Sequence, residues 1–113
     1  MHEMSLCEGV LQVMEDHAVS QGFTQVKKVW LEIGALAGVD PEAMRFGFDV
    51  VMKGTLADGA ELEIIDLPGL SWCMQCSKQV MVKARFDACP DCDSYQLQIT
   101  GGDEMRIKEL EVD

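Results

Sequence analysis

Residues 72–92 read WCMQCSKQVMVKARFDACPDC and contain two CxxC pairs separated by twelve residues. In each pair, two sulfur atoms in a tight turn can face one ion, and we expect a β-hairpin between the pairs to bring the second turn opposite the first. Four thiolates complete a tetrahedral shell with no open position, as in structural zinc sites. A redox dithiol is the alternative, and two such pairs in close succession argue against it. The pattern therefore predicts a structural zinc site formed by Cys73, Cys76, Cys89 and Cys92.

The composition changes on both sides of this stretch, at Pro68-Gly69 and again at Gly101-Gly102. Four of the five cysteines lie between these two points. A segment of about thirty residues has too little apolar surface to fold without a bound metal. We therefore predict that residues 69–100 are a zinc-binding domain, inserted into a nickel-binding α/β domain made of residues 1–68 and 101–113.

A helix is predicted over residues 5–21, because the apolar residues there recur every three or four positions. Ser5 and Glu8 have the spacing of a capping box, and Gly22 is a typical stop. Cys7 lies on the apolar face, where we expect it to be a small core residue. This prediction places residues 1–4 ahead of the first helical turn.

Local patterns also predict the remaining elements. In chain order, they are a half-buried strand over 26–34, a helix that begins at Asp40-Pro41 and ends before Gly54, a strand over 61–65, and a strand over 105–112 with a bulge near Lys108 and Glu109. The predicted fold class is therefore α+β. Two helices pack on a small mixed sheet of about three strands, and the zinc ribbon is an insertion.

The chain carries 9 basic and 20 acidic side chains, which gives a formal net charge of −11. Phosphate backbones would be repelled, and the basic residues form no stripe, so nucleic-acid binding is not expected. The first residues contain neither a basic leader nor a long apolar run, so we expect no signal peptide, no membrane insertion and a cytoplasmic location. In the reducing cytosol, cysteines are better suited to metal binding than to disulfides.

The first three residues, MHE, form a second candidate metal site. Removal of an initiator methionine requires a small second residue, so His2 predicts that Met1 is retained. The Met1 amine, the His2 backbone nitrogen and the His2 imidazole can form fused chelate rings around Ni(II) or Cu(II), which prefer planar nitrogen donors. Glu3 adds a carboxylate that can act as a labile further ligand. A terminus without bound metal is the alternative, and His17 is expected to lie near the last helical carbonyls rather than to bind metal.

The MHE start, the stretch VWLEIGALAGV at residues 29–39, the two CxxC pairs and the final MRIKELEV at residues 105–112 together resemble the HypA/HybF family of nickel metallochaperones for [NiFe]-hydrogenase maturation. The resemblance extends over essentially the whole chain. It implies Ni(II) as transient cargo held by Met1, His2 and Glu3, and structural Zn(II) held by the four CxxC cysteines. One difference is Asp93, which follows the second CxxC where many members carry histidine.

The resemblance also implies partners. Family members deliver nickel to the hydrogenase large subunit together with the GTPase HypB, and in some organisms they contribute to urease maturation. The expected function is therefore metal delivery rather than catalysis, and the sequence contains no convincing nucleophile and base pair. An adaptor whose zinc ribbon recruits maturation partners without carrying nickel is the alternative function.

Overall fold

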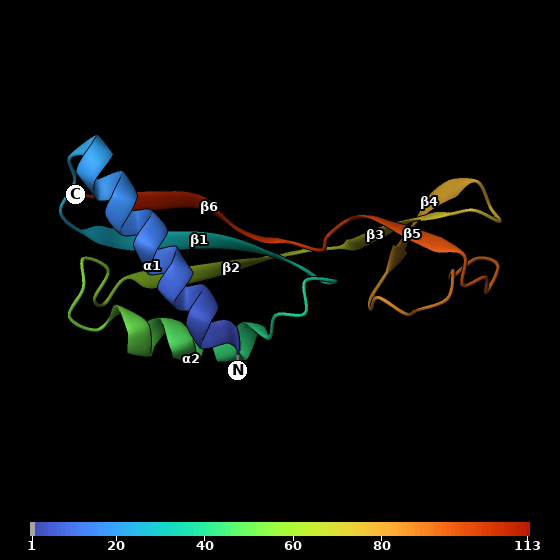
Figure 1. The fold of residues 1–113 in the computed structure, drawn as a ribbon, viewed down its shortest axis with the longest axis horizontal. Coiled ribbons are helices and arrows are strands. Elements are labelled where there is room, and N and C mark those ends of the chain that lie inside the picture. Colours follow the sequence, from blue (N-terminus) through green and yellow to red (C-terminus); the bar gives the residue numbers. More distant parts are fainter. Residues whose placement is uncertain (1) are drawn as a thin grey trace. The chain divides into compact units, whose positions relative to one another are not determined.

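The structure is a computed structural model that describes residues 2–113. Its elements, drawn in Figure 1, are α1 (His2–Gln21), β1 (Val26–Gly34), α2 (Pro41–Met52), β2 (Glu61–Leu67), β3 (Gly69–Cys73), β4 (Lys78–Val82), β5 (Leu97–Gly101) and β6 (Met105–Val112). The strands form two three-stranded sheets, with the orders β2-β1-β6 and β4-β3-β5. These elements confirm the α+β class. Within the described part of the chain, every helix is too short or too polar to span a bilayer.

The chain divides into two compact units. The first, here called the helical unit, comprises the chain up to Leu31, Val39–Ile65 and Arg106–Asp113. The second, here called the cysteine unit, comprises Glu32–Gly38 and Asp66–Met105. The whole of the predicted insertion, residues 69–100, falls within the cysteine unit.

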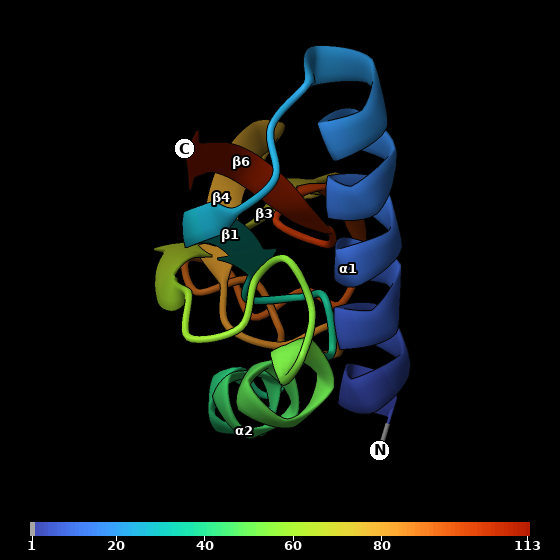
Figure 2. The same cartoon turned by 90° about the vertical axis from the view of Figure 1, so that its left-hand side faces the viewer.

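In the helical unit, α1 packs against α2 and lies along one side of β1 and β6 (Figure 2). The buried apolar side chains of this unit are Cys7, Val10, Met14, Val26, Val29, Leu31, Met44, Phe48, Met52 and Ala57. The helices are close together at Gly47 of α2, where a Cβ atom would lie 3.2 Å from the Met4 Sδ and 3.3 Å from the Cys7 Sγ of α1. Cys7 is fully buried, as predicted for a core residue.

The first helix begins earlier than predicted. It starts at His2, so Ser5 and Glu8 lie inside the helix and do not form a capping box. The reason is a tertiary contact: the Glu3 side chain is 7% exposed and accepts a hydrogen bond from the Asp40 N–H. Packing against α2 therefore adds a turn that the local capping signal does not indicate.

The second helix follows its local signals. Asp40 has an extended backbone, and its Oδ1 accepts hydrogen bonds from the N–H groups of Glu42 at 2.9 Å and Ala43 at 3.5 Å. Pro41 occupies the first helical position, where its missing N–H is not needed. Because the Asp40 N–H also donates to Glu3, this one residue connects the first turns of both helices.

The last strand covers the predicted residues, Met105–Val112. Its alternation of half-buried and exposed residues slips at Lys108 and Glu109, which are both exposed. The bulge inferred there stays a prediction.

In the cysteine unit, β3 pairs antiparallel with β4 on one side and with β5 on the other. One face of this sheet packs over a small core that contains Leu36, Cys73, Val80, Val82 and Cys89. Cys76, Leu97 and Ile99 are partly buried against it. Two of the predicted zinc ligands are thus also core residues of this unit.

Candidate metal centre

The two CxxC turns have the same local geometry. In the first, the Ser77 N–H donates to the Cys73 carbonyl oxygen at 2.8 Å, and Ser77 has a φ of 54°. In the second, the Asp93 N–H donates to the Cys89 carbonyl oxygen at 2.9 Å, and Asp93 has a φ of 63°. These are the only positive-φ residues other than glycine among residues 2–113. Aspartate is several-fold enriched in this left-handed conformation, so Asp93 fits its position in the turn.

The prediction of a hairpin between the two CxxC pairs is wrong. The first CxxC is itself the turn of the β3–β4 hairpin, because Cys73 ends β3 and the left-handed Ser77 reverses the chain into β4. The second CxxC lies in the loop between β4 and β5. The sheet is completed by β5, which follows the second pair and returns to β3, where Leu97 lies opposite Cys73.

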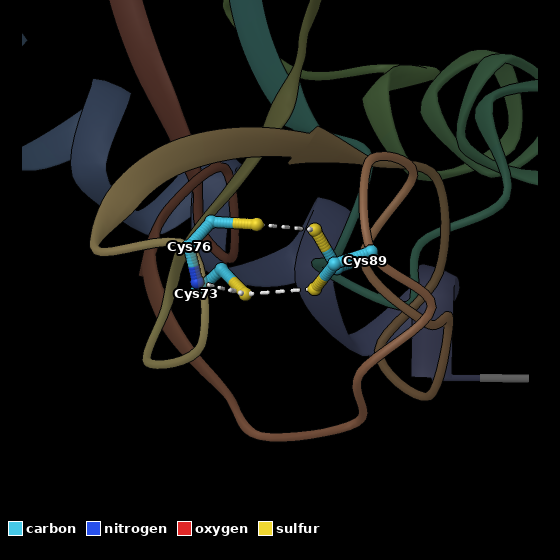
Figure 3. Close-up of side chains that lie close together, drawn as sticks. Cys73, Cys76 and Cys89 are labelled. Atoms are coloured by element: carbon cyan, nitrogen blue, oxygen red, sulfur yellow. Dashed lines mark hydrogen bonds between the residues drawn. The ribbon is translucent and has the colours of Figure 1, made fainter.

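The four sulfur atoms face one another (Figure 3). The Cys73 and Cys92 Sγ atoms are 3.6 Å apart, and the Cys76 and Cys89 Sγ atoms are 3.9 Å apart. All four ligand atoms lie within 4.8 Å of one another. With zinc–sulfur bonds of about 2.3 Å, a regular tetrahedron has sulfur–sulfur edges of about 3.8 Å. The donor set and its spacing therefore fit one tetrahedral zinc ion, as predicted.

The turns also provide hydrogen bonds to sulfur. The Cys76 N–H donates to the Cys73 Sγ, and the Asp91 N–H donates to the Cys89 Sγ, each at 3.4 Å. The Cys76 N–H lowers the pKa of the Cys73 thiol to about 7. The neighbouring Cys92 thiol and burial raise the pKa of the Cys76 thiol to about 12. The first turn thus stabilises the Cys73 thiolate, whereas a cation is needed to displace the proton of the Cys76 thiol.

Leu36, which is distant in sequence from the CxxC pairs, is part of the core of the cysteine unit. Leu36 is 2% exposed and packs with Cys73 and Cys89, and the Arg85 Nε donates to the Leu36 carbonyl oxygen at 3.0 Å. The Leu36 N–H donates to Gly102. The sequence analysis missed this support, because no local pattern links residue 36 to the CxxC pairs.

At the other candidate site, the side chains of the neighbouring residues His2 and Glu3 lie close to each other. His2 is the first residue of α1, its side chain is 56% exposed, and its Nδ1 lies 3.9 Å from the Glu3 Oε2. The same Oε2 accepts the Asp40 N–H at 3.2 Å. Met1, the third predicted ligand residue, lies outside the described residues. The contact with Asp40 has no signal in the sequence, because the two residues are 37 positions apart.

Comparisons with known proteins agree over the whole length. The profile of a family described as "Hydrogenase/urease nickel incorporation, metallochaperone, hypA" matches residues 1–112. The chain is 63% identical to the hydrogenase maturation factor HypA of Alkalilimnicola ehrlichii and 54% identical to that of Azotobacter vinelandii, in each case over 113 residues and 100% of both chains. It is also similar to the solution structure of the Ni metallochaperone HypA from Helicobacter pylori, with a TM-score of 0.71 and 28% identity over 99% of this chain and 97% of that chain.

Proposed function

The chain belongs to the HypA family of hydrogenase and urease nickel-incorporation metallochaperones, and from this premise we propose that it carries Ni(II) on the Met1 amine, the His2 nitrogens and the Glu3 carboxylate. The members of this family are maturation factors and not enzymes. Nickel is therefore cargo that the protein binds and then releases. The observation that carries the proposal is an exposed imidazole beside an anchored carboxylate in the first turn of α1.

The start of the helix at His2 favours nickel binding. The first N–H groups of an α-helix have no acceptor within the helix. A nickel ion can therefore displace the His2 amide proton without breaking a helical hydrogen bond. Because the His2 side chain is 56% exposed, the imidazole is accessible both to an ion and to a protein that receives it.

Glu3 supplies the charge that such a site needs. The N-terminus of a helix carries a partial positive charge, which disfavours a cation. The Glu3 carboxylate, 3.9 Å from the His2 Nδ1, offsets this repulsion. Its hydrogen bond with the Asp40 N–H holds it in place, so that less side-chain entropy is lost when an ion binds.

We propose a purely structural role for zinc, in a domain formed by residues 69–100, and nickel binding in the domain formed by residues 1–68 and 101–113. Four thiolates leave zinc no open coordination position, so the ion can hold the fold but has no place for a substrate. We further propose that the protein acts in the cytoplasm and delivers nickel to the hydrogenase large subunit with the GTPase HypB, and to urease maturation proteins where these exist. The family description, which names nickel incorporation into hydrogenase and urease, supports the nickel-delivery part of this assignment.

Nickel titration of the untagged, zinc-loaded protein tests the proposed site. The His2→Ala variant should lose the tight nickel site, whereas His17→Ala should keep it. These two variants remove the only two histidines of the chain from opposite ends of the same helix, so they match in composition. A short glycine-serine extension ahead of Met1 should also weaken binding, because it replaces the primary amine by an amide.

Zinc content and circular dichroism should be unchanged in all three variants, which would show that the fold is intact. Equal nickel affinity in His2→Ala and the unaltered protein would refute the proposed site. A protein that binds no nickel yet still binds maturation partners would instead be an adaptor.

A further inference from the structure

A groove of about 340 Å³ runs between α1 and β6 within the helical unit, and its lining contains none of the proposed metal ligands. Its lining residues are Val13, His17, Ile107, Lys108, Glu109 and Leu110. Val13 is 43% exposed, whereas Val10 of the same helix is buried. The groove therefore exposes apolar side chains that the fold of this unit does not cover.

The lining residues on β6 show how the groove runs along this strand. Successive side chains of a strand point to opposite faces, so a groove on one face is lined by alternate residues. Here four consecutive residues, 107–110, line the groove. The alternation of β6 slips at Lys108 and Glu109, which are both exposed, and β6 is an outer strand in the order β2-β1-β6, so the groove is lined by a strand at a sheet edge. Such an edge is a template for pairing with another chain.

The charge around the groove is acidic on the helix side. On α1, the exposed acidic residues next to Val13 and His17 in the sequence are Glu15 and Asp16, and the helix has no lysine or arginine. On the strand side, Glu109 lies in the lining, with Lys108 as its one basic neighbour there. The chain as a whole has a formal net charge of −11. A ligand for this groove should therefore carry basic side chains.

We propose that this groove binds an extended, basic segment of a partner protein, which pairs with the edge of β6 and places its apolar side chains against Val13 and Leu110. Its alternate lysine or arginine side chains face Glu109 and the exposed Glu15 and Asp16 of α1. Charge excludes a second copy of this chain as the occupant, because docking would bring two acidic surfaces together. The surface is separate from the proposed nickel site, so binding there does not require nickel.

The test uses the full-length, zinc-loaded protein labelled with ¹⁵N and a short synthetic peptide in which valine and lysine alternate. Backbone amide signals of residues 107–110 and of α1 around Val13 should shift on addition of the peptide. Raising the salt concentration from about 0.05 M to about 0.5 M should weaken binding, because the attraction between exposed charges is screened. A peptide with glutamate in place of lysine, and one with serine in place of valine, should both fail to bind.

Two matched pairs of variants locate the site. Val13→Glu should weaken peptide binding about tenfold, whereas Val19→Glu, at a residue of the same helix that is 88% exposed, should not. Glu109→Lys should weaken it about threefold at low salt, whereas Asp49→Lys makes the same charge change on the exposed side of α2 and should have little effect.

The proposal is wrong if the glutamate peptide binds equally well, if no peptide binds, or if the shifted amides lie elsewhere. It is also wrong if the groove signals shift with protein concentration alone, which would indicate self-association. Nickel stoichiometry should be unchanged in Val13→Glu and Glu109→Lys. This control keeps a failure of the groove proposal distinct from a failure of the nickel proposal.

Discussion

Removal of zinc from the four cysteines should unfold the cysteine unit and leave the helical unit folded. The two units differ in how much apolar surface they bury. The helical unit has a core of ten buried apolar residues, including Phe48, Met14 and Leu31. In the cysteine unit, the core cluster contains only Leu36, Val80 and Val82 in addition to the ligands Cys73 and Cys89.

The magnitudes favour zinc as the main source of stability in the cysteine unit. A fully buried valine or leucine side chain contributes about 1.5–3 kcal/mol, and the cluster has three such aliphatic residues, with Leu97 and Ile99 only partly buried against them. Structural zinc binds with an apparent free energy of about 10–16 kcal/mol. Without that contribution, the unit should not stay folded.

The two tryptophans make this prediction measurable, because Trp30 lies in the helical unit and Trp72 in the cysteine unit. The variants Trp72→Phe and Trp30→Phe each leave one reporter. On addition of a strong zinc chelator, the emission of Trp72 should shift toward that of the unfolded chain, while the emission of Trp30 should stay native. Zinc should restore the Trp72 signal. A metal-free protein in which Trp72 keeps its native emission and the amides of residues 69–101 stay protected from exchange would refute the reasoning.

Two further predictions concern the same unit. Gly102→Ala should destabilise it by about 3 kcal/mol or more, because a φ of +75° costs about 1–2 kcal/mol and the new Cβ atom would overlap the Pro68 carbonyl oxygen. The control is Gly38→Ala, at a φ of +71° with no atom within 4 Å of the new Cβ, which should cost only about 1–2 kcal/mol, for the backbone conformation. Denaturation curves followed by Trp72 emission compare the stabilities of the two variants. Zinc affinity should fall by about tenfold or more per pH unit as the pH is lowered. Zinc must displace the proton of the Cys76 thiol, whose pKa is raised to about 12. Below pH 7 it must also displace the proton of the Cys73 thiol, whose pKa is about 7. Competition with a chromophoric chelator between about pH 6 and pH 8 measures this dependence, which a constant affinity would contradict.

The sequence predicts the parts of this fold that depend on neighbouring residues. The alternation over 26–34 coincides with β1, and Asp40-Pro41 starts α2, because pleat and capping are properties of a few consecutive positions. The four cysteines were identified for the same reason, since the spacing within each CxxC determines the turn. For the four sulfur atoms to bind one ion, the fold had only to bring the two CxxC turns next to each other.

The errors arise where distant residues decide the local structure. The first turn of α1 depends on the contact between Glu3 and Asp40, and the cysteine core depends on Leu36. The misplaced hairpin has a different cause. Each CxxC turn ends in a left-handed residue, Ser77 or Asp93, that reverses the chain by itself. The twelve residues between the two CxxC pairs therefore contain only one strand, β4, and no hairpin of their own. The other strand that pairs with β3 is β5, which follows the second CxxC.

A nickel carrier that also contains zinc must keep the two metals apart, and affinity alone does not do so. Divalent nickel and zinc compete for similar ligands, so a protein selects between them by the geometry and the type of the ligands rather than by intrinsic affinity. The four cysteines, held by two rigid turns at tetrahedral spacing, suit zinc and disfavour the planar geometry that nickel prefers. The proposed nickel ligands belong instead to consecutive residues at a helix end, where the His2 side chain is half exposed. Donors that are adjacent in sequence and open to solvent can be removed one at a time by an incoming protein ligand. A closed set of four thiolates offers no such first step, so the proposed sites would allow the same chain to retain zinc while it releases nickel.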